Sequence, residues 1–301
     1  MGHDRLFIKR DDMTGLGQGG NKTRSLEFLL GDALSKGANA VITAGGLQSN
    51  LCSLTAAACA RYGLRCILVH NDDPPQMREG NMLLNAILGA EERFVGRTDE
   101  AARTAAMEDV AVSLRSRGER PYIIYNGAST PLGAMGYVSG AFELHRQCVD
   151  EGIPLKHVGM VGAMGGTAGG FVFGTAVLGH PFHVHVISVE YPKEVLLRLM
   201  KELFAGLADL TGVSPVMPPE EVMTIYDEYL GAGYAVPTEL SRRTLLDLAR
   251  TEGILIENVY TSKTLGGFGD LIRRGMVPAG EAACYVHTGG LGSLFAQNAM
   301  L

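Results

Sequence analysis

The chain has 301 residues, a formal net charge of −6, and 46% hydrophobic against 19% charged residues. This composition allows a large core and excludes an intrinsically disordered protein, and the acidic balance argues against a nucleic-acid-binding protein. The 5 cysteines include no C-x-x-C pair, so they indicate reduced thiols in a cytoplasmic protein and neither a disulfide framework nor a bound metal.

Short apolar runs alternate along the chain with stretches of helical spacing. We expect strands at Leu6–Lys9, Ala40–Thr43, Cys66–Val69, Tyr122–Tyr125, Val158–Val161, His183–Val189 and Ala283–His287. Repetition of strand and then helix predicts parallel sheets with helices on both faces. At roughly 150 residues per domain, the length predicts two α/β domains. Because no low-complexity linker separates them, we expect the two domains to be interleaved.

A run of glycines precedes a lysine in the segment GLGQGGNKTRSLEF, residues 15–28. The glycines match the dinucleotide fingerprint G-x-G-x-x-G, but too many residues separate them from the preceding strand for its tight turn. A P-loop needs glycine directly before its lysine, and Asn21 stands there. A nucleotide-binding protein that uses Gly15–Gly20 is the alternative from a different functional class. A cation is mildly unfavourable at a helix N-terminus, which disfavours an ordinary surface role for Lys22.

Two later glycine turns also follow expected strands and open expected helices. In AGGLQSN, residues 44–50, Ser49 or Asn50 is expected to cap a helix through Ala56–Ala60, either as a plain cap or as a carboxylate site. In GAMGGTAGG, residues 162–170, successive backbone N–H groups suit a phosphate, although close helix–strand packing would need the same glycines. Open α/β sheets bind ligands at the carboxyl ends of their strands, so these turns are the first candidates for chemistry.

The segment 158–179 carries no charged residue and is long enough to cross a bilayer. Its glycines cluster in the middle, where they least favour a spanning helix. A strand, a glycine turn and a buried helix explain the segment better, and we expect no membrane association.

A series of motifs in fixed order resembles the D-cysteine desulfhydrase and 1-aminocyclopropane-1-carboxylate (ACC) deaminase family. The motifs are KRDD, GGNKTRSLEFLL, GGLQSN, GYAVP, VYTSKTLGG and HTGG. The resemblance covers nearly the whole chain and implies a pyridoxal-phosphate (PLP) enzyme of fold type II, similar to tryptophan synthase β. It implies two interleaved, open, twisted α/β domains with mostly parallel sheets. We expect residues 1–25 and 137–301 to form the large PLP-binding domain and residues 26–136 the small domain.

The resemblance also implies roles for single residues. Lys22 matches the lysine that binds the cofactor aldehyde covalently, which suits a lysine whose charge is disfavoured where it stands. The expected cofactor contacts are Lys22, Asn50 at the phenolic oxygen, the phosphate loop of Gly165, Gly166, Thr167, Ala168 and Gly169, and Thr288 at the pyridine nitrogen. The expected catalytic residues are Lys22, Ser49, Tyr234 and Tyr260, and the expected substrate contacts are Gln48, Ser49, Asn50 and Thr261.

Two positions separate the branches of the family that this chain resembles. Members that deaminate ACC carry Glu and Leu where this chain has Thr261 and Thr288, as the desulfhydrase branch does. The resemblance therefore implies α,β-elimination from a small amino acid with a β leaving group, giving pyruvate and ammonia, in a cytoplasmic homodimer. After QSN the family commonly has His and, two residues on, Arg, but here Leu51 and Ser53 follow, so the substrate side chain stays open. A PLP-dependent racemase, a cysteate-type sulfo-lyase and, less strongly, an ACC deaminase are the alternatives on this scaffold.

Overall fold

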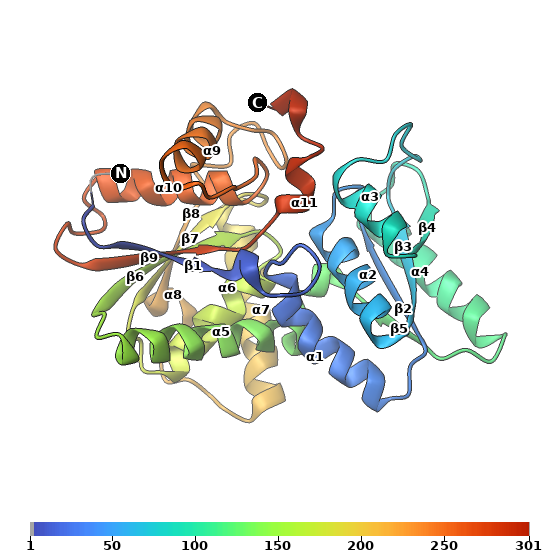
Figure 1. Cartoon of the computed structure of the whole chain (residues 1–301). Coiled ribbons are helices and arrows are strands. Elements are labelled where there is room, and N and C mark those ends of the chain that lie inside the picture. Colours follow the sequence, from blue (N-terminus) through green and yellow to red (C-terminus); the bar gives the residue numbers. More distant parts are fainter. Residues whose placement is uncertain (1–2, 301) are drawn as a thin grey trace.

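The computed structural model describes residues 3–300, which form two parallel sheets with helices on their faces (Figure 1). The five-stranded sheet has the order β1-β9-β6-β7-β8, with bounds Leu6–Arg10, Ala282–His287, Leu155–Gly162, His183–Ser188 and Met223–Tyr226. The four-stranded sheet has the order β4-β3-β2-β5, with bounds Glu91–Phe94, Arg65–His70, Ala40–Gly45 and Pro121–Ile124. Every pair of neighbouring strands is parallel, so the expected fold class is confirmed.

Helices cover both faces of each sheet. They are α1 (Lys22–Ser35), α2 (Asn50–Tyr62), α3 (Gly80–Ile87), α4 (Glu100–Arg115), α5 (Pro131–Asp150), α6 (Gly166–Val177), α7 (Lys193–Thr211), α8 (Pro219–Val222), α9 (Glu239–Glu252), α10 (Thr261–Arg273) and α11 (Leu291–Leu294), with short 3-10 turns at Asp11–Met13, Asn126–Ala128 and Asn298–Met300. Side chains of α1 and α2 pack on one face of the four-stranded sheet and those of α4 on the other. Strand β9 shows the same for the larger sheet, because Cys284 faces the α5 and α6 side while Tyr285 faces α9 and α10.

All the strands expected from the apolar runs are present, and two further strands were missed. The missed strand β4 reads EERF and lies at a sheet edge, where charged side chains replace the apolar run that would have revealed it. The other, β8, is an edge strand of four residues, MTIY. The domain division at 25/26 and 136/137 stays a prediction, although the strands between residues 40 and 124 form one sheet and the others form the second.

The uncharged segment 158–179 contributes to β6 and the buried helix α6, as expected from its glycines. A Cβ at Gly170 would collide with the Ala134 carbonyl oxygen of α5, and one at Gly174 would lie 2.9 Å from the Val138 carbonyl oxygen. These glycines therefore let α5 and α6 pack backbone to backbone. Within residues 3–300, no helix has the length and apolar character needed to cross a membrane.

A row of histidines lies toward the amino ends of β6 and β7, away from the glycine turns. His157 Nδ1 and His185 Nε2 are 3.0 Å apart, and the second ring nitrogen of each contacts Glu281 Oε2 (2.6 Å) and the Tyr226 hydroxyl (3.1 Å), respectively. Burial, together with the positive charges of protonated His183 and His157, lowers the pKa of His185 to about 3. The folded protein therefore keeps His185 neutral well into the acidic range.

We expect the free energy of unfolding to fall as the pH drops below about 6.5, the ordinary pKa of histidine. Below that pH the unfolded chain binds a proton at His185 that the folded protein does not bind, and this difference persists until about pH 3. Between pH 6.5 and 5 the loss from this residue is about 1.5 kcal/mol. Urea unfolding at the two pH values measures the loss, which should be smaller in His185→Gln than in the control His145→Gln on α5. Equal losses in the two variants would contradict the assignment.

Candidate active site

The expected motifs meet around the start of α1, at the carboxyl ends of strands in the larger sheet. The Asn21 backbone N–H donates to the Thr288 carbonyl oxygen (2.9 Å), directly after β9. The Asn21 side-chain Nδ2 donates to Thr167 Oγ1 (2.8 Å), in the first turn of α6. The residue before Lys22 therefore ties the lysine to both the HTGG turn and the GAMGGTAGG turn, in the region where open sheets bind ligands.

The glycine run before Lys22 has a packing role. Gly20 has φ = 126°, and a Cβ there would lie 3.1 Å from the Thr288 carbonyl oxygen. A Cβ at Gly289 would lie 2.7 Å from the Gly20 Cα, and one at Gly17 would lie 3.1 Å from the Ala57 Cβ on α2. The chain thus passes between the β9 turn and α2 with room for hydrogen atoms only. This explains the fingerprint-like spacing without a nucleotide.

Lys22 is the first residue of α1 and is half-buried. Its Nζ donates to the Gly127 carbonyl oxygen at 2.7 Å. Burial lowers the pKa of Lys22 to about 8, against the opposing effect of the Glu190 carboxylate. About a tenth of the amine is then neutral at pH 7, compared with less than about a thousandth at the ordinary lysine value. The setting therefore supplies a nucleophilic amine.

The turn between β6 and α6 has the features of a phosphate cradle. Gly165, with φ = 87°, precedes α6, and among the described residues no side chain caps the free N–H groups of that helix. A Cβ at Gly166 would lie 2.6 Å from Ser129 Oγ and 2.9 Å from the Ser129 Cα. The other members, Thr167, Ala168 and Gly169, follow in the first turn of α6. Free N–H groups and the helix dipole favour a dianion here, so the residues fit a phosphorylated ligand.

The QSN motif lies at the start of α2. Ser49 caps the helix, since its Oγ accepts from the Cys52 backbone N–H at 3.3 Å. Asn50 Oδ1 accepts from Asn81 Nδ2 at 2.9 Å. Gln48 Oε1 accepts from the Asn81 backbone N–H (2.9 Å), and Gln48 Nε2 donates to the Glu79 carbonyl oxygen (3.2 Å). The Gln48 amide thus fixes the start of α3 by hydrogen bonds, and its contact with a substrate stays a prediction.

The two expected tyrosines lie together. The hydroxyl groups of Tyr234 and Tyr260 form a short hydrogen bond, and their rings meet edge to face with centroids 5.8 Å apart. Burial raises the pKa of Tyr234 to about 12 and that of Tyr260 well above its ordinary value. Both hydroxyls therefore stay protonated at neutral pH and can donate a proton. Lys263 Nζ holds the loop before Tyr234 through the carbonyl oxygens of Leu230 (2.7 Å) and Gly233 (2.9 Å).

The two threonines that are expected to separate the family branches have different surroundings. Thr261 is buried, and its hydroxyl lies 2.8 Å from the Glu257 N–H and 3.2 Å from both the carbonyl oxygen and the carboxylate of Glu257. To contact a substrate, this hydroxyl would have to leave Glu257, so that role stays a prediction. Thr288 is also buried, and its carbonyl oxygen faces the Lys22 loop through Asn21.

Glu190 was missed in the sequence. It lies two residues after the end of β7 and is half-buried, and its carboxylate acts on the titration of Lys22, Tyr234 and Tyr260. Burial raises the pKa of Glu190 itself, while the charge of Lys22 opposes that rise. The available signal was an acidic residue immediately after an expected strand, at the sheet edge that carries the other motifs.

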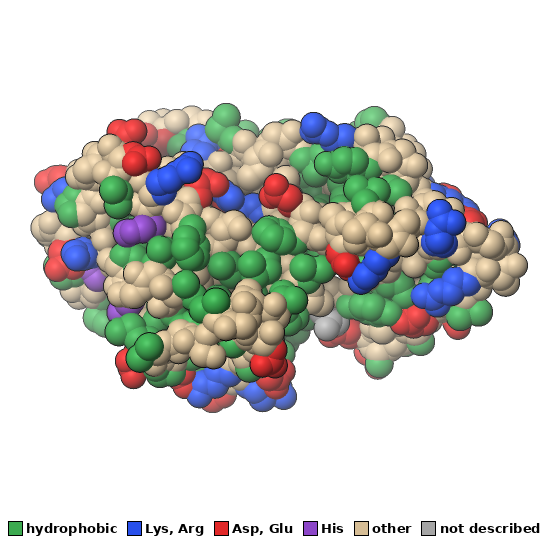
Figure 2. Space-filling model, turned by 90° about the horizontal axis from the view of Figure 1, so that it is seen from below, with side chains coloured by type: hydrophobic (Ala, Val, Ile, Leu, Met, Phe, Trp, Pro, Cys, Tyr) green, Lys and Arg blue, Asp and Glu red, His purple; other side chains and the backbone are tan. Residues whose placement is uncertain are grey.

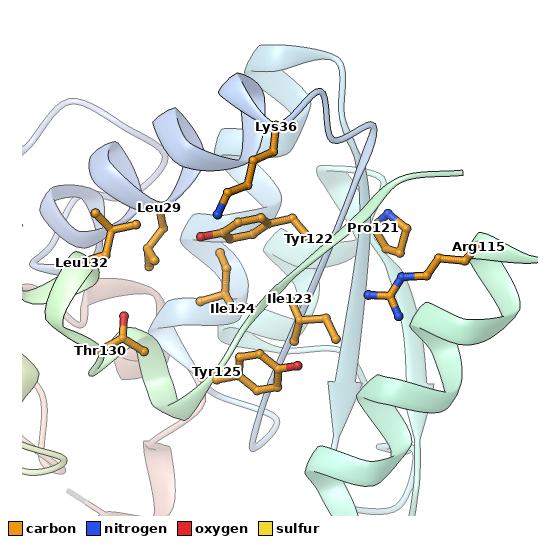
Figure 3. Close-up of a pocket in the computed structure, with 10 residues that line it drawn as sticks. All are labelled: Leu29, Lys36, Arg115, Pro121, Tyr122, Ile123, Ile124, Tyr125, Thr130 and Leu132. Atoms are coloured by element: carbon orange, nitrogen blue, oxygen red, sulfur yellow. The ribbon is translucent and has the colours of Figure 1, made fainter. Parts of the chain in front are cut away.

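A separate cavity of about 390 Å³ lies along the edge strand β5 (Figure 3). Two of its polar groups share one partner: the Tyr122 hydroxyl donates to Asp32 Oδ2 (2.8 Å), and Lys36 Nζ pairs with the same carboxylate (2.7 Å). Lys22, Asn50 and the phosphate cradle do not line it. We therefore place the candidate active site at the strand ends and not in this cavity.

Comparisons with known proteins show which family the chain resembles. The family model of pyridoxal-phosphate dependent enzymes matches residues 1–289. The chain is 36% identical over 299 residues to a D-cysteine desulfhydrase of Klebsiella pneumoniae, covering 97% of this chain and 89% of the relative. It is 33% identical over 302 residues to an ACC deaminase of Burkholderia vietnamiensis, covering 98% and 89%.

A solved structure of an ACC deaminase homologue superposes with a TM-score of 0.89 at 35% identity, over 98% of this chain and 87% of that one. Matches of this extent identify the family, and the phosphate cradle and the lowered pKa of the half-buried Lys22 suit its cofactor. Relatives with both names are almost equally similar, so the names leave the substrate open. The chain belongs to the pyridoxal-phosphate-dependent enzymes, as a lyase of the ACC deaminase and D-cysteine desulfhydrase family.

Proposed function

We propose that this lyase catalyses α,β-elimination from a small amino acid with a β leaving group, releasing pyruvate and ammonia. The observation that carries the proposal is the neutral residue Thr261, which stands where the ACC deaminases that this chain resembles have Glu. The Glu257 carboxylate beside Thr261 has a structural role, because it accepts hydrogen bonds from the backbone N–H groups of Val259 (2.7 Å), Tyr260 (2.8 Å) and Thr261 (2.8 Å).

The chain's residues fit the cofactor in four places. Lys22 would bind its aldehyde carbon, and the free N–H groups from Gly166 onward would hold its phosphate. Asn50 would donate to its phenolic oxygen, and the Thr288 hydroxyl would face its pyridine nitrogen. When bound, PLP accepts the electron pair left at the substrate Cα, and a neutral hydroxyl at the nitrogen makes that acceptance weaker than a carboxylate would.

Substrate handling is assigned to groups on both sides of the site. Ser49 and the N-terminus of α2 would hold the substrate carboxylate through backbone N–H groups. Lys22, once its amine is free, would take the Cα proton, for which a pKa of about 8 is well placed. Tyr260 or Tyr234 would donate a proton to the leaving group, because both hydroxyls are protonated at neutral pH.

We also propose a homodimer that works in the cytoplasm on a small amino acid. All 5 cysteines are free and buried, which suits a reducing compartment. Helix α5 lies low in Figure 1 and exposes Phe142 (42%) and Val149 (65%). The view from below shows hydrophobic side chains gathered in the middle of the left part of the molecule, which contains the five-stranded sheet, with charged side chains toward the edge of that part (Figure 2). Such a surface favours contact with a second copy.

The proposed reaction predicts pyruvate from D-cysteine or β-chloro-D-alanine and negligible 2-oxobutyrate from ACC. Elimination needs only proton loss beside a good leaving group, whereas ring opening needs wider delocalisation of the charge. A keto-acid assay on D- and L-substrates measures both products. Faster 2-oxobutyrate release would reject elimination as the main reaction, and racemisation without keto acid would support the racemase alternative.

The leaving-group role of Tyr260 is tested with Tyr260→Phe and two substrates. Chloride leaves without a proton but hydroxide does not, so the variant should slow elimination from serine by about 100-fold or more and from β-chloroalanine far less. Tyr234→Phe is the matched variant, and the larger differential identifies the donor. An equal loss on both substrates in both variants would remove the tyrosines from this step.

Replacing Glu190 by glutamine should shift the pH dependence of cofactor capture. The carboxylate stabilises the charged form of Lys22, so its removal lowers the pKa of Lys22 further below about 8. The rate at which the cofactor-free protein binds PLP covalently should rise with pH through about 8 in the wild type, and through a lower pH in the variant. Stopped-flow absorbance across pH gives both midpoints. A midpoint that moves upward would show that Glu190 acts on another group.

A further inference from the structure

Asn81 is a fully buried residue in the first turn of α3, and every polar group of its side chain is engaged. Its Nδ2 donates to the Gln48 carbonyl oxygen (2.9 Å) and to Asn50 Oδ1 (2.9 Å). Its Oδ1 accepts from Gln18 Nε2 (3.3 Å), in the loop that leads to Lys22. One amide thus joins the QSN motif to the lysine loop.

This network fixes which end of the Asn50 amide faces away from Asn81. A backbone carbonyl oxygen can only accept, so the Asn81 group that bonds to the Gln48 carbonyl must be its Nδ2. The same Nδ2 meets the Asn50 amide, which must therefore offer its oxygen. The Nδ2 of Asn50 is then the end left to donate to a ligand.

The surroundings leave Asn81 no other orientation. A Cβ at Gly292 would collide with Asn81 Oδ1, and one at Gly80 would lie 2.5 Å from Gln48 Oε1 and 2.8 Å from the Gly292 carbonyl oxygen. The Asn81 backbone N–H also donates to Gln48 Oε1 (2.9 Å). The start of α3 is thus clamped between the QSN turn and α11, and a flip of the Asn81 amide would bring its NH₂ group against Gln18 Nε2 and its oxygen against a carbonyl.

We propose that Asn81 is a positioning residue that holds Asn50 with its Nδ2 toward the cofactor's phenolic oxygen. The inference rests on the proposed role of Asn50. A hydrogen bond donated to this oxygen would stabilise its ionised form and so lower the pH at which the bound cofactor loses a proton. Asn81 thereby sets the pH at which the bound cofactor gains or loses that proton.

Two substitutions separate orientation from packing. In Asn81→Asp the side chain keeps its size but, when ionised, can only accept, so Asn50 turns its Nδ2 toward residue 81 and its oxygen toward the cofactor. In Asn81→Ala the orientation is released but not reversed. The pH midpoint of the bound cofactor's visible absorbance should rise by about one unit in Asn81→Asp and by less in Asn81→Ala. A purely structural role predicts the opposite order, because alanine removes more contacts than the isosteric aspartate.

Asn85 supplies the matched control, since it is equally buried one turn later on α3 and its Nδ2 lies 3.4 Å from Glu92 Oε1. Asn85→Ala should leave the midpoint unchanged. An unchanged midpoint in Asn81→Asp, or a larger shift in Asn81→Ala, would overturn the proposal. Asn50→Leu separates failure of the Asn81 proposal from failure of the proposed cofactor contact of Asn50. If Asn50→Leu shifts the midpoint and Asn81→Asp does not, only the positioning role of Asn81 is rejected. If neither variant shifts the midpoint, the cofactor contact of Asn50 is rejected as well. Should Asn81→Asp not fold, an upward shift in Asn81→Ala that the equally buried control Asn85→Ala does not show supports the proposal, and equal midpoints in these two variants overturn it.

Discussion

Replacing Lys22 by alanine should abolish covalent cofactor attachment and lower turnover by at least about a thousandfold, with the fold intact. Among the described residues, Lys22 makes one side-chain hydrogen bond, to the Gly127 carbonyl oxygen, and alanine is a better helix former at the first position of α1. The substitution therefore removes the nucleophile and little of the structure. Borohydride reduction followed by peptide mass spectrometry should place the cofactor on Lys22 in the wild type and nowhere in the variant.

Lys36, directly after the other end of α1, is the matched control. Its side chain is 65% exposed and pairs with Asp32 at 2.7 Å. Lys36→Ala should keep both the label and the turnover, because an exposed lysine with an ordinary partner is a poor nucleophile at neutral pH. A reduced cofactor found on the buried Lys263, or on any lysine other than Lys22, would contradict the assignment.

The fold could be predicted where burial leaves a continuous apolar run. Strands β2 and β9 are buried along their whole length and, apart from His287 at the end of β9, their residues are apolar or small enough to reveal them. Strand β4 could not be found in this way, because only one face of an edge strand is covered and its sequence EERF carries three charges. The parallel topology followed from the strand–helix alternation, whereas the strand order depends on contacts between residues far apart in the chain.

The candidate site divides along similar lines. Lys22, Ser49 and the glycine cradle belong to contiguous motifs whose local backbone the sequence specifies. Asn81 reaches the QSN turn only because α3 folds back over residues 48–50, and no local pattern marks it. No local pattern marks Thr261 either as a residue whose hydroxyl is held by Glu257, a contact that only the folded structure shows. The motifs therefore predicted the residues of the candidate site, but not which side chains form hydrogen bonds that hold other residues in place.

Replacing Gly166 by aspartate should weaken PLP binding by about 100-fold or more. A carboxylate there would stand at the first N–H groups of α6, where the cofactor phosphate is proposed to bind, and two like charges about 4 Å apart repel strongly even at a protein surface. The side chain also meets Ser129, since a Cβ at Gly166 would lie 2.6 Å from its Oγ. Titration of the cofactor-free protein with PLP, followed by visible absorbance, gives the dissociation constant.

Gly166→Asn separates the charge from the collision, because asparagine has the same size as aspartate and displaces Ser129 to the same extent. The affinity of Gly166→Asp for PLP should be at least about tenfold lower than that of Gly166→Asn, a difference of about 1.4 kcal/mol. With pyridoxal, which lacks the phosphate, the two variants should bind equally well. Equal affinity of both variants for PLP, or the same deficit of the aspartate variant with pyridoxal, would show that the phosphate does not bind at the start of α6.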